Sequence, residues 1–114
     1  MMYKPATPKN IWIMTSIKVL VVDDEPDLLE ISKEFLELDK SLSVDAVTSA
    51  DDALGQLRHQ NYDVIVSDYQ MPDKDGIQLL KEIRGAGNKV PFILFTGRGR
   101  EEIAIEAFEN GADH

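Results

Sequence analysis

The chain has 114 residues, of which 43% are apolar and 29% are charged, so it can form one domain with a real core and is too apolar for a disordered segment. Its formal net charge of −9 argues against nucleic-acid binding, because nucleic-acid phosphates attract Lys and Arg. It has no cysteine, which excludes disulfides and thiolate metal sites, and no apolar stretch approaches the roughly 18 residues of a membrane-spanning helix.

Residues 1–15 are predicted to be an N-terminal extension or tag-like arm. They contain two lysines and two prolines, and their apolar run at 11–14 is too short for the core of a signal peptide. The folded domain is predicted to cover residues 16–114.

Four apolar runs predict four β-strands, at 19–22, 44–47, 64–66 and 92–95. The first, third and fourth runs are nearly continuous, which is typical of strands that are covered on both faces in a parallel sheet. The second run alternates with polar residues, which predicts an edge strand that is wet on one side.

Helical periodicity follows each predicted strand, within 26–39, 49–60, 76–87 and 100–111. Pro26 suits the first turn of the first helix, and Ser49 is expected to cap the second. One apolar face of the first helix is predicted to comprise Leu28, Ile31, Phe35 and Leu38. Alternation of strands and helices with short connections predicts a parallel α/β sheet with helices on both faces.

Polar side chains follow these strands at the carboxyl rim, where ligands bind in open parallel sheets. Asp23 and Asp24 follow the first strand, Asp68 follows the third, and Thr96 follows the fourth. The first and third strands are expected to be neighbours, so the three carboxylates should share a pocket and repel one another unless a cation binds there. Mg²⁺ is the cation that suits such hard oxygen ligands.

Each of these residues also has a simpler interpretation. Asp24 could be an N-cap or first-turn acid before Pro26, Asp68 could start an Asx-turn, and Thr96 could cap the fourth helix. Their joint occurrence at strand ends favours a shared site.

Four stretches, "VLVVDDEP", "DVIVSDYQMPDKDG", "PFILFTG" and "AFENGADH", resemble the receiver (response-regulator) domain of two-component phosphorelay signalling in order and spacing. The resemblance extends from Ile17 to His114. It implies a flavodoxin-like doubly wound parallel sheet. It also implies that Mg²⁺, or Mn²⁺ as a substitute, is a cofactor.

The resemblance implies a role for each candidate site residue. Asp68 matches the phosphoacceptor, and Thr96 matches the hydroxyl that responds to the phosphoryl group. The implied metal ligands are Asp23, Asp24, Asp68 and the backbone carbonyl of Gln70. The implied partners are a histidine kinase or a histidine phosphotransfer protein as phosphodonor, and a partner or fused domain that receives the signal. We expect a cytoplasmic signalling domain rather than a turnover enzyme, without contact to nucleic acid or membrane.

The family pattern continues beyond the last residue, His114, with a fifth strand that ends in a lysine and with a fifth helix. We therefore expect a receiver domain that is incomplete at its C-terminus, with a sensor, kinase or output domain fused beyond it. The fourth strand, Phe92–Phe95, would then be an unpaired apolar edge, which predicts self-association through this strand and the fourth helix.

Two other functions are compatible with the same residues. One is a metal-dependent phosphatase or hydrolase that uses Asp68 as nucleophile, although enzymes of the haloacid-dehalogenase type need a second acid at the position of Gln70. The other is a degenerate receiver that serves only as a protein-binding module.

Overall fold

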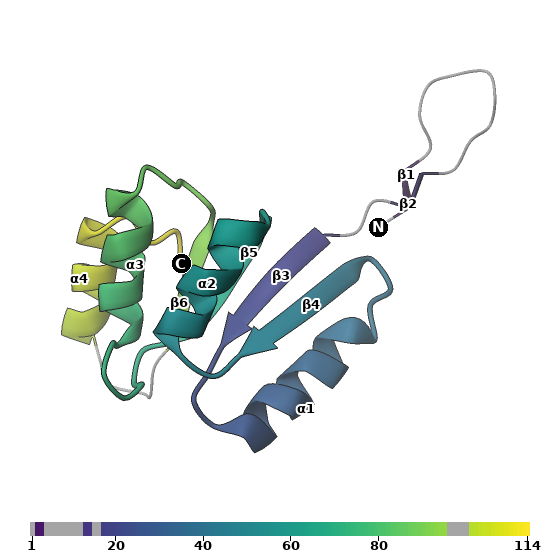
Figure 1. Cartoon of the computed structure of the whole chain (residues 1–114), viewed down its shortest axis with the longest axis horizontal. Coiled ribbons are helices and arrows are strands. Elements are labelled where there is room, and N and C mark those ends of the chain that lie inside the picture. The colour runs from purple at the N-terminus through teal and green to yellow at the C-terminus, as the bar shows by residue number, and fades with distance from the viewer. Residues whose placement is uncertain (1, 4–12, 15–16, 96–100) are drawn as a thin grey trace.

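The computed structural model describes residues 2–3, 13–14, 17–95 and 101–114, and its main feature is a four-stranded parallel sheet with helices on both faces (Figure 1). The strand order is β4-β3-β5-β6, and every neighbouring pair is parallel. The predicted doubly wound, flavodoxin-like sheet is confirmed. Its elements are β3 (Ile17–Val22), α1 (Pro26–Glu37), β4 (Leu42–Val47), α2 (Ala50–His59), β5 (Val64–Asp68), α3 (Gly76–Gly85), β6 (Phe92–Phe95) and α4 (Glu101–Glu109).

Two short strands precede this sheet. β1 (Met2–Tyr3) and β2 (Ile13–Met14) pair with each other in antiparallel orientation and form a separate two-stranded sheet. The division of the chain into an arm at 1–15 and a domain at 16–114 stays a prediction. Among the described residues, no helix has both the length and the apolar character that crossing a bilayer requires.

The central strand β3 separates two apolar clusters, because successive side chains of a strand point to opposite faces of a sheet. Leu20 and Val22 face the larger cluster, whereas Val19 and Val21 face the smaller one. β4 lies at one end of the strand order, as predicted for an edge strand, and Val44 is its one fully buried residue.

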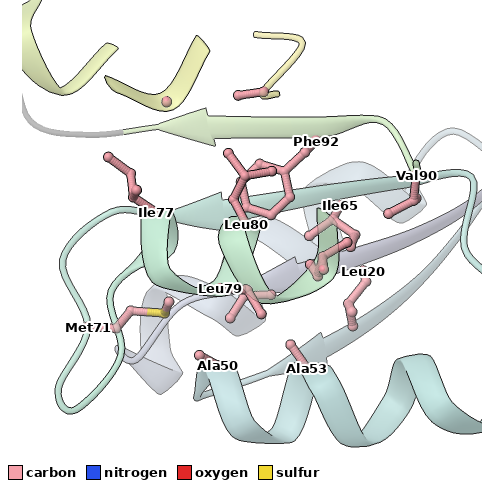
Figure 2. Packing of buried hydrophobic residues seen from close by; sticks show 14 of the residues in the cluster. Leu20, Ala50, Ala53, Ile65, Met71, Ile77, Leu79, Leu80, Val90 and Phe92 are labelled. Atoms are coloured by element: carbon pink, nitrogen blue, oxygen red, sulfur yellow. The ribbon is translucent and has the colours of Figure 1, made fainter. Parts of the chain in front are cut away.

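The larger cluster lies between the sheet and the helices α2, α3 and α4 (Figure 2). Leu20, Ile65 and Phe92 come from three adjacent strands and are completely buried. Leu79, Leu80 and Ile83 of α3, together with Ala50 and Ala53 of α2, cover them. Each large apolar side chain buried in this way contributes roughly 1.5–3 kcal/mol to stability, so this face supplies most of the core.

Helix caps fix where α2 and α3 begin. The Ser49 hydroxyl accepts a hydrogen bond from the Asp52 N–H at 3.0 Å, which confirms the predicted cap of α2. Asp75 caps α3 and forms a capping box with Gln78: its carboxylate accepts the Gln78 N–H at 2.8 Å, and the Gln78 side chain accepts the Asp75 N–H at 2.9 Å. These bonds satisfy backbone donors that a helix start leaves free.

The first residue of α3 lies against the backbone of β5. A Cβ atom on Gly76 would lie 2.4 Å from the carbonyl oxygen of Asp68 and 2.6 Å from Cδ1 of Leu94. Real Cβ atoms essentially never approach backbone so closely, so only glycine lets α3 begin at this distance from the strand.

The apolar face that the sequence predicted for α1 is mostly exposed in the structure. The exposed fractions of Leu28, Ile31, Phe35 and Leu38 range from 50% to 77%. α1 instead contacts the sheet through Leu29 and Leu36. The apolar surface of this helix is wider than a single contact with the sheet can cover.

The exposed side of α1 borders a hollow on the same face of the sheet. This apolar groove has a volume of about 340 Å³ and is lined by Val21, Ile31, Ser32, Phe35, Leu36, Val66 and Phe95. A contiguous exposed apolar patch of this kind marks an interface or an aggregation site.

The outer edge of β6 is partly paired, which corrects the expectation of an unpaired edge. The Leu94 N–H donates to the carbonyl of His114 at 2.7 Å, and the Asp113 N–H donates to the carbonyl of Phe92 at 2.9 Å. The Arg84 guanidinium holds this segment by donating to the carbonyl of Gly111 at 2.8 Å. The apolar groove, rather than the β6 edge, is therefore the better candidate for self-association.

We predict that the 114-residue chain self-associates through the apolar groove. The variant Ile31→Lys/Phe35→Lys should lower the concentration-dependent mass in light scattering, because it places charges in the groove. Both side chains are more than 60% exposed, so folding stability should change by no more than about 0.5 kcal/mol. The matched control is Ile105→Lys/Phe108→Lys on α4, where both side chains are also exposed. A loss of association in the α4 variant alone would contradict the groove and support the fourth helix.

The close approach at Gly76 gives a second prediction. Gly76→Ala should lower the free energy of unfolding by about 3 kcal/mol, since the methyl group displaces the start of α3 from β5. Gly55→Ala is the control, because a Cβ there would meet only an Arg58 side-chain atom at 3.9 Å. That variant should gain up to about 1 kcal/mol, as expected for Gly→Ala inside a helix. Urea denaturation measures both, and equal stabilities would contradict the close approach.

Candidate functional site

Three carboxylates meet at the carboxyl rim of the two central strands. Asp23 and Asp24 follow β3, and Asp68 ends β5. β3 and β5 are adjacent, with Val22 opposite Ser67 in the register, so Asp23 stands level with Asp68. One oxygen atom of each carboxylate lies within 4.8 Å of the other two. The structure thus brings together the three acids that the sequence placed at this rim.

Asp23 is the most deeply buried of the three, with an exposed fraction of 6%. Its backbone N–H donates to the carbonyl of Val47 at 3.1 Å, which ties it to β4. Its carboxylate accepts the Glu25 N–H at 3.0 Å, and this bond orients the group as the chain turns into α1. A buried carboxylate is costly unless its charge is paired, so this position favours a bound cation.

Asp68 is half-buried, and its surroundings raise the pKa of its carboxyl above the ordinary value. Burial is the main cause, and the charge of Asp23 adds to it. Hydrogen bonds from the N–H groups of Gln70 and Tyr69 oppose the shift, and the charge of Asp24 reinforces it slightly. The repulsion expected from the sequence thus adds to the effect of burial at Asp68.

The donor set fits a hard divalent cation. Three carboxylate oxygens within 4.8 Å of one another are the ligands that Mg²⁺ prefers, and a cation between them would offset the charges that raise the pKa of Asp68. A cavity of about 410 Å³ adjoins the cluster and leaves room for a further ligand. Its lining residues are Asp24, Tyr69, Gln70, Met71, Pro72 and Asp75.

The loop 69–75 forms one wall of this cavity and carries Gln70. The loop starts at Tyr69, whose N–H donates to the carbonyl of Phe95 at 2.9 Å, and it closes where the Gly76 N–H donates to the carbonyl of Tyr69 at 2.8 Å. Met71 is buried in the larger cluster and anchors the middle of the loop. Gln70 is exposed beside Asp24 in the cavity, so its position is compatible with the ligand role that the resemblance implies.

Thr96 lies outside the described residues, so its role as switch hydroxyl stays a prediction. The residue before it, Phe95, ends β6 and stands opposite Asp68 in the register of β5 and β6.

Two residues near the site were missed by the sequence analysis. Asp75 caps α3, although the spacing of an acid and a glutamine three residues later is a signature that the sequence displays. Lys74 pairs with Asp51 of α2 and Glu82 of α3, each at 2.9 Å. No sequence spacing signals the pair with Asp51, because tertiary packing brings the two residues together.

Asp68→Asn should raise the melting temperature at pH 7 without added metal. The pKa of Asp68 is higher in the folded state than its ordinary value, so the folded protein binds this proton more tightly than the unfolded chain does. Ionised Asp68 therefore destabilises the fold progressively as the pH rises above the ordinary carboxyl range. The advantage of Asn should be present at pH 7 and should vanish below about pH 4.

Thermal melts between pH 3 and pH 8 measure this difference. Glu30→Gln, at an exposed position in the middle of α1, is the control and should show no comparable pH-dependent gain. An Asp68→Asn variant that is less stable than the wild type at pH 7 would contradict the electrostatic picture of the site.

Comparisons with known proteins agree with this geometry. A family model described as the response regulator receiver domain matches residues 19–114. The transcriptional regulatory protein ResD of Bacillus subtilis is 34% identical over 96 residues, which are 84% of this chain and 39% of ResD. Response regulator Rre1 of Synechocystis is 33% identical over 99 residues, or 85% of this chain and 43% of Rre1. The chain thus spans about two-fifths of the length of these relatives.

Solved structures show the same fold. The receiver domain of the Francisella response regulator 1452 has a TM-score of 0.80 and 34% identity, and the match covers 86% of this chain and 80% of that one. The response regulator TrrA of Thermotoga maritima, in complex with Mg²⁺ and BeF, has a TM-score of 0.74 and 30% identity, with 85% and 82% covered. Because the family match extends over most of the chain and agrees with the observed strand order, the chain belongs to the response regulator receiver domain family.

Proposed function

We propose that this chain accepts a phosphoryl group on Asp68 from a phosphohistidine, in the phosphoacceptor role that its family has in two-component signalling. The observation that carries the proposal is the convergence of Asp23, Asp24 and Asp68 at the rim of the sheet. The same three carboxylates, with the backbone carbonyl of Gln70, would hold Mg²⁺, or Mn²⁺ in its place.

The position of Asp68 suits a nucleophile. It ends a strand that is paired on both sides, so its carboxylate is held in place while it stays only half-buried. In the transfer, a carboxylate oxygen forms a bond to phosphorus as the bond from phosphorus to the histidine nitrogen breaks. With the other ring nitrogen of the phosphohistidine protonated, the products are an aspartyl phosphate and a neutral imidazole. A held nucleophile favours this in-line geometry, and bound Mg²⁺ would offset the charge on the entering group.

The partners follow from the same proposal. The phosphodonor would be a histidine kinase or a histidine phosphotransfer protein, and the Thr96 hydroxyl would respond to the phosphoryl group. The changed conformation would then act on a partner or on a fused sensor, kinase or output domain. In this role residues 16–114 form a cytoplasmic signalling domain rather than a turnover enzyme, and residues 1–15 form an arm ahead of it.

Phosphorylation at Asp68 is tested with a small phosphodonor. The chain incubated with phosphoramidate and Mg²⁺ should gain the mass of one phosphoryl group on the peptide that contains Asp68, and Asp68→Asn should gain none. Asp75→Asn is the matched control: it removes a carboxylate from the same cavity, while Asn still caps α3. This control should be labelled like the wild type.

Labelling of the Asp68→Asn variant on the same peptide would overturn the assignment. A wild type that binds Mg²⁺ but takes up no phosphoryl group from any donor would instead point to a receiver that serves as a protein-binding module.

Mg²⁺ binding is tested separately by thermal melts. A ligand that binds only the folded state stabilises it by about 2.7 kcal/mol at a hundredfold excess over its Kd, so millimolar Mg²⁺ should raise the melting temperature. Asp23→Asn and Asp24→Asn should each reduce this rise, since each removes a charged ligand. An unchanged midpoint of the wild type at millimolar Mg²⁺ would contradict the site.

A further inference from the structure

Lys74 connects the loop 69–75 to two helices. Its Nζ lies 2.9 Å from a carboxylate oxygen of Asp51 in the first turn of α2. The same Nζ lies 2.9 Å from a carboxylate oxygen of Glu82 in α3. Both helices contribute to the larger apolar cluster, so the Lys74 ammonium group connects the loop to the well-packed face of the sheet.

The loop contains one residue with an uncommon backbone conformation, next to Lys74. Asp73 has φ +68°, in the left-handed region that few residues other than glycine adopt. The next N–H, that of Lys74, donates to the carbonyl of Pro72 at 2.8 Å, so the chain reverses tightly at this point. Strained backbone of this kind persists where the surrounding structure holds it, and Lys74 is adjacent to the strained residue.

We propose that Lys74 is a positioning residue, which holds the loop 69–75 in the conformation from which Gln70 presents its carbonyl to the metal. This inference rests on the proposed function, since it assumes that Mg²⁺ binds at the three carboxylates. Lys74 is about one-third exposed and its partners more so, and exposed ion pairs contribute little to global stability. The effect of Lys74 should therefore be local to the loop and to metal affinity.

The direction in which Lys74→Gln changes the Mg²⁺ affinity distinguishes a positioning role from a purely electrostatic one. Lys74→Gln removes a positive charge near an acidic metal site. If only the field mattered, this change would strengthen Mg²⁺ binding, because cations repel one another. If Lys74 positions the loop, the same change weakens binding, because the Gln70 carbonyl is less often in place.

The experiment measures Mg²⁺ affinity of the full chain by isothermal titration calorimetry. Lys74→Gln should raise the Kd about tenfold, as is typical when the support of a metal ligand is lost. Lys74→Arg should restore most of the affinity, since Arg can pair with both carboxylates. Lys81→Gln is the matched control, because it removes the same charge from an exposed position on α3 and should leave the affinity unchanged or slightly higher.

The two carboxylate partners provide an independent check. In a chain with Asp51→Asn and Glu82→Gln, Lys74 has lost both ion pairs, so adding Lys74→Gln should cause no further loss of affinity. Amide hydrogen exchange without metal gives a second readout: residues 69–76 should exchange faster in Lys74→Gln than in Lys81→Gln.

The outcomes distinguish this inference from the proposed function. A wild type that does not bind Mg²⁺ overturns the metal site and the inference with it. A wild type that binds Mg²⁺, together with a Lys74→Gln variant that binds equally or more tightly, overturns the positioning role alone.

Discussion

The pairing of β3 with β5 is the constraint on which the rest of the structure depends. It sets Val22 level with Ser67, and this register brings Asp23 to the height of Asp68. The three carboxylates at the rim are close together because the backbone ladder holds them there, despite their mutual repulsion. The repulsion among these carboxylates destabilises the fold, and a bound cation would reduce it. Without a cation, apolar packing elsewhere in the molecule must offset this repulsion.

That packing is unequal on the two faces of the sheet. The face covered by α2, α3 and α4 carries the large cluster, and the site is built from this side: α3 begins against the backbone of Asp68, and Met71 anchors the loop in the core. A site that needs fixed geometry is therefore supported by the better-packed half of the molecule. The face of α1 carries a smaller cluster and an open apolar groove.

The parts of this arrangement that could be predicted from the sequence depend on local pattern. Strand positions, the cap at Ser49 and the placing of Asp23, Asp24 and Asp68 at one rim follow from apolar runs, spacing and the alternation of elements. The burial of α1 could not be predicted in this way. Its apolar residues extend around more than one side of the helix, and periodicity does not tell which side packs on the sheet. Leu29 and Leu36 pack in the smaller cluster, whereas Phe35 is exposed. The partners of Lys74 were missed for a related reason, since Asp51 belongs to a helix that only the tertiary fold brings near.

The electrostatics of the rim also explain why the site needs so many backbone restraints. Like charges would separate if the chain could relax, and contacts restrain two of the three carboxylates. The Glu25 N–H restrains Asp23, and the N–H groups of Gln70 and Tyr69 restrain Asp68. The bond from the Gly76 N–H to the carbonyl of Tyr69 closes the adjoining loop. The N–H donors at Asp68 only partly compensate its raised pKa, so its charge remains incompletely satisfied by the protein alone. A group that is rigidly held and incompletely satisfied gains most from a bound cation, because little conformational reorganisation is then required. In this fold the same restraints that hold the three carboxylates together would therefore suit the rim to a bound cation.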